Sequence, residues 1–248
     1  MRRFTCRSEG WIIILVMLAP TAMTYLYFFL LAGQGSLTRI VYLLSKVATG
    51  LIPILWYCKL YFESLRATSA DLVLDQKPRH LLSFKIGLDF GLFTVAAILL
   101  FYYLWVLDMP LLQTVSVQVK AKLADAGATS LTRFLLLAGF LSILHSAFEE
   151  YYWRWFVYGR LATGLPWLWA AIISSVGFML HHVLVLYHFL PGLDGIWLIV
   201  ICSLGIGFGG FIWCAIYRYT GSLLGAWVAH LCADLVIMWL GWNIVTRS

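Results

Sequence analysis

The sequence predicts an all-α protein, a polytopic membrane helical bundle of about seven transmembrane helices with one further amphipathic helix at the interface. The first observation behind this prediction is composition. Hydrophobic residues occupy 62% of the 248 positions, charged residues occupy 11%, and the mean hydropathy is +0.90. A soluble domain carries about a quarter charged residues, so lipid must form part of the solvent of this chain.

The second observation is the length of the apolar runs, because a helix needs about 20 apolar residues to cross the hydrocarbon. The runs lie near residues 11–33, 41–62, 84–107, 131–156, 166–190, 194–217 and 221–245. Unpaired backbone groups cannot face lipid, so each run is expected to be helical. The first run is long for a signal peptide, and we interpret it as an uncleaved first helix.

The domain organisation follows from the absence of a long polar stretch in the sequence, so residues 1–248 are expected to form a single integral membrane domain. N-terminal helices occupy residues 1–107, a connector occupies 109–128, and helices with buried polar residues occupy 131–245. Apolar residues share one helical face of the connector: Leu112, Val115, Val119 and Leu123. This pattern predicts an amphipathic helix on the membrane surface, either a plain connector or a guide for a substrate.

The charge distribution points to a membrane protein rather than to a nucleic-acid-binding protein. The formal net charge is +6, but lysine and arginine lie in short clusters at the ends of apolar runs, as membrane anchors do. Their bias predicts a cytoplasmic N-terminus and an external C-terminus. The five cysteines show no CxxC spacing and predict neither a disulfide framework nor a metal motif. We expect a prokaryotic inner membrane, since no organellar feature is evident.

The last two predicted spans contain glycines at a spacing of four residues. Gly205 and Gly209 are four residues apart, as are Gly221 and Gly225. Such pairs let helices approach closely, which predicts that the polar residues nearby face protein rather than lipid.

The first polar motif is FEEYYWR at residues 148–154. Glu149 and Glu150 point about 100° apart on a helix, which predicts separate roles. Glu150 and Arg154 are four residues apart and can pair on one face, which leaves Glu149 for another partner. A partly desolvated carboxylate suits a general base, and His145, one turn earlier, could support it. The alternative interpretation is an interfacial salt bridge that ends the helix.

The second motif is FMLHH at residues 178–182, where Phe178 shares a helix face with His182 and His181 points elsewhere. A packed, hydrogen-bonded histidine is the alternative interpretation. His188, near the outer end of the same span, is expected to be interfacial.

The third motif is HLCAD at residues 230–234. His230 and Asp234 are four residues apart and can address one cavity, where Asp234 could orient the imidazole or contact a substrate carbonyl. Ionisable residues inside a membrane are costly, so these positions are functional candidates.

Together the motifs EExxxR, FxxxH and HxxxD occur in order, one on each of three helices. In this order, the sequence resembles the CPBP family of intramembrane proteases, which includes the Ras-converting CAAX endopeptidase, over about residues 131–240. The third motif ends in Asp234, where the CAAX endopeptidases usually have asparagine. The matching residues are Glu149, Glu150, Arg154, Phe178, His182, His230 and Asp234.

The resemblance implies hydrolysis of a peptide bond within or beside the membrane, in a membrane-anchored or C-terminally tailed protein. Glu149 with His182 would take the proton of an attacking water, and His230 with Asp234 would donate to the oxyanion. Glu150, Arg154, Phe178 and His145 are the expected supporting residues.

A metal-free glutamate mechanism is favoured for this hydrolysis. A single zinc ion held by Glu149, His182 and His230 is the alternative. Three other functions stay open: a proton-coupled transporter, a histidine-ligated haem or electron-transfer protein, and a scaffold without activity.

Overall fold

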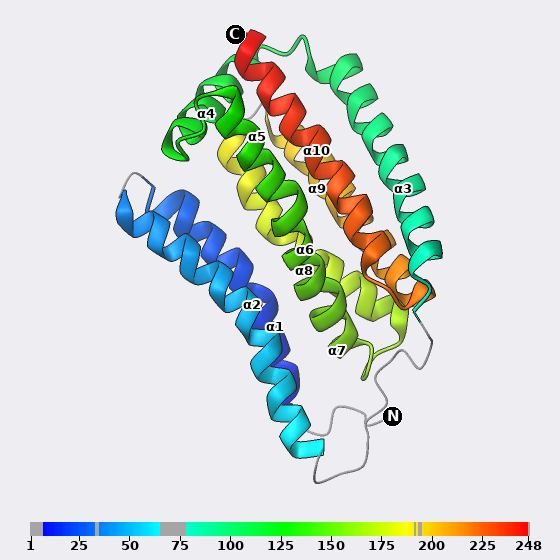
Figure 1. The fold of residues 1–248 in the computed structure, drawn as a ribbon. Helices are drawn as coiled ribbons and strands as arrows, with labels where there is room; N and C mark the ends of the chain where they lie inside the picture. Colours follow the sequence, from blue (N-terminus) through cyan, green and yellow to red (C-terminus); the bar gives the residue numbers. More distant parts are fainter. Residues whose placement is uncertain (1–6, 33–34, 65–77, 191, 193–194, 248) are drawn as a thin grey trace.

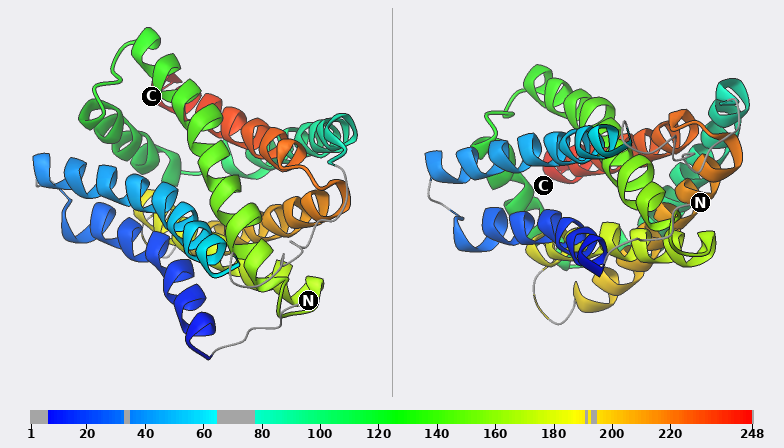
Figure 2. Two further views of the ribbon diagram at one scale, coloured as in Figure 1. Left: turned by 60° about the horizontal axis from the view of Figure 1, so that its bottom comes forward. Right: turned by 90° about the horizontal axis from the view of Figure 1, so that it is seen from below.

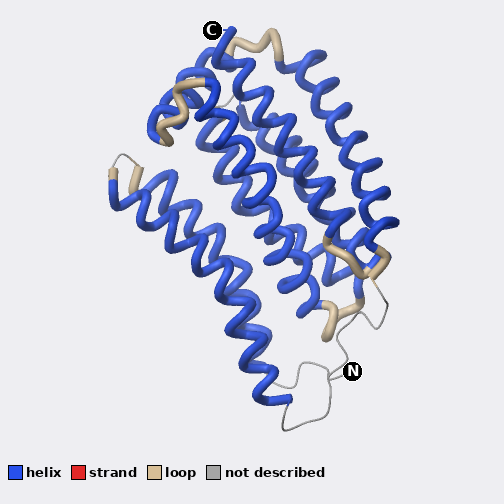
Figure 3. Tube along the Cα trace, viewed as in Figure 1, coloured by secondary structure: helices blue, strands red, loops and turns tan. Residues whose placement is uncertain are grey.

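The computed structural model describes residues 7–32, 35–64, 78–190, 192 and 195–247, and every regular element in them is a helix (Figures 1 and 3). The elements in chain order are α1 (Arg7–Tyr25), η1 (Leu26–Leu30), α2 (Ser36–Ser64), α3 (His80–Phe101), η2 (Tyr102–Val106), α4 (Leu111–Asp125), α5 (Leu131–Gly139), η3 (Phe140–His145), α6 (Ser146–Glu150), η4 (Tyr151–Tyr158), α7 (Gly159–Leu161), α8 (Trp167–Phe189), α9 (Ile196–Thr220) and α10 (Leu224–Arg247). The η elements are π-helical.

The predicted all-α membrane bundle is confirmed, but the count of seven spans is not. Among the described residues, six helical stretches are long and apolar enough to cross a membrane: Ile12–Leu30, His80–Val106, Leu131–Leu161, Trp167–Phe189, Ile196–Thr220 and Leu224–Arg247. The remaining predicted span, 41–62, is helical as part of α2, but its apolar stretch Leu43–Trp56 is shorter. Lys46 and Lys59 fall within that predicted span and lower its apolarity.

Neighbouring helices pack in both directions: α1 with α2 and α8 with α9 are antiparallel, whereas α1 with α8 and α3 with α10 are parallel (Figure 1). α1 and α2 form a hairpin on one side of the bundle, and α1 packs along α8 (Figures 1 and 2). α8 also packs along α9, and α3 packs along α10. α6 contacts α10, and η4, which continues α6, contacts α8, so the helices that carry the three polar motifs meet.

The predicted fourth span is one helical run from Leu131 to Leu161 in which α and π turns alternate. π turns are rare and are often found at functional sites. The short α6, which carries the glutamate pair, lies between the π segments η3 and η4. Two side-chain hydrogen bonds join η4 to other helices: Ser174 Oγ of α8 donates to the Trp153 carbonyl at 3.0 Å, and the Tyr152 hydroxyl donates to the Val16 carbonyl of α1 at 2.6 Å.

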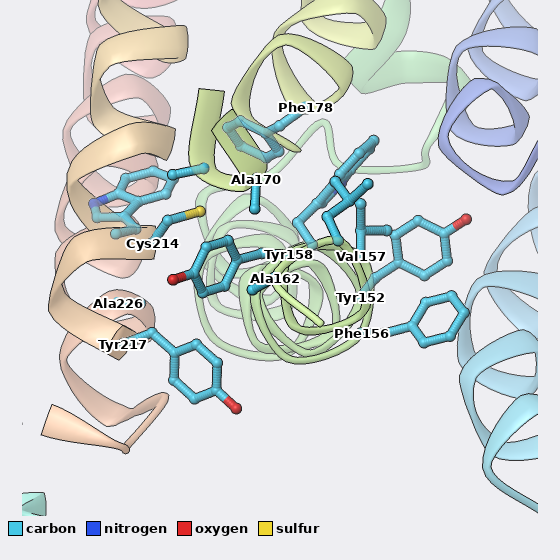
Figure 4. Close-up of a cluster of buried hydrophobic side chains, with 14 of the residues drawn as sticks. Tyr152, Phe156, Val157, Tyr158, Ala162, Ala170, Phe178, Cys214, Tyr217 and Ala226 are labelled. Carbon is cyan, nitrogen blue, oxygen red and sulfur yellow. The ribbon is translucent and has the colours of Figure 1, made fainter. Parts of the chain in front are cut away.

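The main core lies where η4 meets α8, α9 and the start of α10 (Figure 4). It is rich in aromatic residues, and Tyr152, Trp153 and Phe178 are each 1% exposed. Phe178 joins this core to Arg154 of η4 and His230 of α10. The core therefore fixes the positions of the helices that supply the candidate site.

The connector forms a helix as predicted. In α4, Val115 and Leu123 are buried, while Lys120 and Asp125 are exposed. Burial lowers the pKa of Lys122, whose ammonium lies 4.8 Å from the ring centre of Tyr27. The position of α4 at a membrane surface stays a prediction.

Glycines do bring two helices together, although only one residue of the predicted pairs does so. A Cβ on Gly225 of α10 would lie 2.2 Å from the Ser83 carbonyl oxygen of α3. Gly221 instead ends α9 with a φ of 68°, a left-handed conformation that favours glycine. The prediction for Gly205 is wrong, because a Cβ there would meet no described atom within 4 Å. On α9 the close contacts are made by Gly207 and Gly210.

We expect Gly225→Ala to destabilise the protein by about 3 kcal/mol, because the new methyl group forces α10 away from the α3 backbone. Gly241→Ala on the same helix is the matched control, since a Cβ there meets nothing within 4 Å among the described residues. It should change stability by less than about 1 kcal/mol. Thermal unfolding of both variants in one detergent measures the difference, and equal unfolding temperatures would contradict the close crossing.

Candidate active site

The site contains a buried ion pair. Arg154 Nη1 donates to Glu150 Oε1 at 3.0 Å, as the four-residue spacing predicted, and both side chains are 1% exposed. The same Oε1 lies 2.7 Å from Nδ1 of His230 on α10. Because a carboxylate only accepts hydrogen bonds, His230 Nδ1 carries the proton and donates the hydrogen bond to Glu150. Glu150 thus connects the helical run of α6 and η4 to α10.

Glu149 faces histidines from three elements. Its Oε1 lies 3.4 Å from Nε2 of His145 in η3 and 3.4 Å from Nε2 of His181 in α8. Its Oε2 lies 3.7 Å from Nε2 of His230. The Glu149 side chain is 12% exposed, so it is mostly but not completely shielded from solvent. A carboxylate in this setting has proton donors and acceptors around it and little water.

His182 is held by its own helix. Its Nδ1 lies 3.0 Å from the Phe178 carbonyl oxygen, which can only accept, so Nδ1 carries the proton. The Nε2 lone pair of His182 is then available to accept a proton or to bind a cation. The Phe178 ring packs on the same imidazole, with centroids 4.6 Å apart.

Asp234 lies at the more open side of the cluster. Its Oδ1 is 3.6 Å from Nε2 of His230, one turn earlier on α10, and its side chain is 25% exposed. His230 therefore has Glu150 at one ring nitrogen, and Glu149 and Asp234 at the other. Three carboxylates, four imidazoles and one guanidinium gather in this part of the bundle, and such a cluster can move protons and stabilise developing charge.

A comparison with family models gives a match for the segment that carries this cluster. Residues 131–236 match the family of Rce1-like type II CAAX prenyl endopeptidases. This segment belongs to the CAAX protease family. All three motifs fall inside the matched residues. Neither the comparison with curated proteins nor the comparison with solved structures gives a match.

The CAAX protease domain makes this chain a membrane-embedded peptide hydrolase. The resemblance seen in the three motifs is thereby confirmed at the level of the family. The match assigns no role to the individual motif residues.

The CAAX protease domain brings together every residue that the sequence singled out in the three motifs. His188 is separate: it lies at the end of α8 against Phe28, with ring centroids 4.8 Å apart. The two glutamates share one partner. Glu149 and Glu150 leave α6 in different directions, yet both reach His230, because its two ring nitrogens lie on different edges of the imidazole.

Sequence reasoning missed His181. A helical wheel turns it away from His182, but both imidazoles reach Glu149, and their centroids are 4.0 Å apart. Trp153 of η4 lies parallel to the His181 ring, 5.8 Å away at 3°, and keeps it turned towards α6. His181 is 6% exposed, and neither ring nitrogen has a well-formed hydrogen bond among the described residues. The doublet HH was the only signal in the sequence.

The zinc alternative fits a ligand set that differs from the expected one. Oxygen and nitrogen atoms of Glu149, His181 and His182 lie within 4.8 Å of one another. Ligands about 2.1 Å from a tetrahedral zinc ion lie about 3.4 Å apart, so small side-chain movements would close this set. The Nδ1–H of His182 on a backbone carbonyl is the outer contact that metal-binding histidines usually make. His181 takes the place of His230, which is not among the residues whose ligand atoms lie within 4.8 Å of one another.

Proposed function

We propose that this chain is an intramembrane endopeptidase in which Glu149 and His182 activate a water for attack on a peptide bond. The observation that carries the proposal is the convergence of Glu149, His182 and His230 from α6, α8 and α10 on one place in the bundle. The membership of residues 131–236 in the CAAX protease family supports it.

Water activation follows from the acceptors that the site offers. A Glu149 oxygen and a ring nitrogen of His182 lie within 4.8 Å of each other, a separation that one water can bridge with two hydrogen bonds. The carboxylate takes the proton as the water attacks, and the neighbouring His145 and His181 hold that carboxylate in place. Glu149 then returns the proton to the leaving amine.

Oxyanion stabilisation is proposed for His230 and Asp234. The Nδ1–H of His230 donates to Glu150, so donation to an oxyanion uses the Nε2–H of the cationic ring. Asp234 donates only while it carries its own proton. Glu150 and Arg154 act through His230, because they fix the orientation of its ring.

This mechanism needs no metal. If zinc binds, Glu149, His181 and His182 would hold it, and it would supply a more acidic water. We expect proteolysis by the purified protein to persist unchanged after treatment with 1,10-phenanthroline and removal of the chelator. Activity that is lost on chelation and restored by added zinc would contradict the metal-free mechanism.

The proposed substrate is a membrane-anchored protein or a protein with a C-terminal membrane tail, cut inside or beside the bilayer. The family description names CAAX prenyl substrates. For this multi-pass membrane protein we propose a prokaryotic inner membrane, because no organellar feature is evident in the sequence. The lysine and arginine bias supports a cytoplasmic N-terminus.

The test is a comparison of membrane proteomes from cells that carry the wild-type protein or Glu149→Gln. We expect at least one membrane-anchored protein to be shorter only in the wild-type cells. If no protein changes length while a proton or solute flux depends on Glu149, the transporter alternative replaces this proposal.

A further inference from the structure

α9 carries none of the three motifs, yet one of its side chains touches two of the motif residues. Trp213 is 4% exposed and stacks on the His230 imidazole, with centroids 4.5 Å apart and planes at 18°. The guanidinium carbon of Arg154 lies 4.8 Å from the centre of the same indole. Trp213 therefore contacts both of the groups that hydrogen-bond to Glu150 Oε1.

The Arg154 guanidinium depends on aromatic faces for most of its environment. Only its Nη1 reaches Glu150, whereas Nε and Nη2 have no hydrogen-bond partner among the described residues. Phe178 lies 4.4 Å from its guanidinium carbon on another side. Aromatic faces attract desolvated cations, so Phe178 and Trp213 stabilise a charge that carboxylates neutralise only in part.

α9 also makes room for this charge. A Cβ on Gly210, one turn before Trp213, would lie 3.0 Å from Arg154 Nη2 and 3.3 Å from the Phe178 ring. Gly210 thus leaves space for the Arg154 guanidinium on one face of α9, and Trp213 presents its indole ring to the same group. Both features serve polar residues of other helices rather than the packing of α9 alone.

We propose that Trp213 is a positioning residue for peptide hydrolysis, which sets the plane of the His230 ring and holds Arg154 against Glu150. The inference rests on the proposed function, because it assigns His230 to the reacting carbonyl. With the ring plane set by the indole, Nδ1 points at Glu150 and Nε2 at the space between Glu149 and Asp234. Without the indole, the imidazole can rotate, and Nε2 no longer points at the space between Glu149 and Asp234.

Kinetics test this role with a membrane-anchored peptide that the wild type cuts and Glu149→Gln does not. Trp213→Leu should lower kcat at least about tenfold with KM unchanged, the size expected for loss of one desolvated cation–π contact. Trp213→Phe, which keeps an aromatic face, should recover kcat to within about threefold of the wild type. Trp242→Leu is the matched control, since Trp242 packs on Phe134, 4.5 Å away between centroids, elsewhere on α10.

The control variant should lose stability but keep the wild-type kcat. Equal kcat values for Trp213→Leu and Trp242→Leu would overturn the proposal while leaving the proposed function intact, because the wild type would still cut the peptide.

A spectroscopic measurement tests the geometry without any substrate. In protein labelled on histidine rings, the His230 signal, identified by its loss in His230→Asn, should be shifted upfield by the ring current of the indole. Trp213→Leu should remove that shift, and Trp213→Phe should keep part of it. A His230 signal that is the same in the wild type and Trp213→Leu would overturn the inference, whatever the activity of the wild type.

Discussion

Glu149→Gln should lower kcat for peptide hydrolysis by about a thousandfold or more, because a general base contributes roughly 10²- to 10⁴-fold and glutamine cannot take a proton from water. The amide has nearly the shape of the carboxylate, and its oxygen can still accept from His145 or His181. The protein should therefore fold as the wild type does. Product formation from a membrane-anchored peptide, measured in vesicles with matched amounts of folded protein, gives the ratio.

Asp89→Asn is the matched control for this loss. Asp89 is a carboxylate in the membrane-spanning α3, but it is exposed on the surface of the bundle and outside the site. The same loss of charge at Asp89 should leave kcat unchanged. If Glu149→Gln keeps kcat within about tenfold of the wild type, Glu149 is not the base.

Arg154→Ala should destabilise the protein by about 3–5 kcal/mol, since removing one partner of a buried ion pair leaves an uncompensated charge behind. Among the described residues, Glu150, at 1% exposure, would keep only His230 as a partner. Unfolding of the detergent-solubilised protein by increasing fractions of sodium dodecyl sulfate measures this change. The double variant Glu150→Gln with Arg154→Met should recover much of the stability that Arg154→Ala loses. In this double variant both charges of the buried pair are removed, so neither is left without its partner.

Arg133→Ala provides the comparison for an arginine at the surface. Arg133 lies at the exposed start of α5, where its Nη1 makes one long hydrogen bond of 3.5 Å to the Gly127 carbonyl. Its loss should cost less than about 1 kcal/mol. Equal effects of Arg133→Ala and Arg154→Ala would mean that the Glu150–Arg154 pair contributes little to the fold.

The parts of the site that sequence predicted are those within one helix turn. Spacing of four residues predicted the contacts of Glu150 with Arg154, His145 with Glu149, and His230 with Asp234. Helical periodicity determines such neighbours before any tertiary packing exists. The apolar runs likewise predicted the helices, because lipid allows few other structures.

The contacts between helices could not be predicted in the same way. His181 faces Glu149 because Trp153 of another helix directs its ring, and Trp213 reaches His230 through the packing of α9. The π turns on both sides of α6 also break the regular 100° step on which a helical wheel depends. Since Arg218 is the only Asp, Glu, His, Lys or Arg residue of α9, nothing in its sequence marked it as part of the site.

The most direct measurement is mass spectrometry of a membrane-anchored peptide after incubation with the purified protein in ¹⁸O-labelled water. Water attack aided by Glu149 predicts a shortened peptide that carries ¹⁸O in its new terminal carboxylate, formed by the wild type and not by Glu149→Gln. A peptide that stays intact with the wild type, or a labelled product formed equally by Glu149→Gln, would contradict hydrolysis at this cluster.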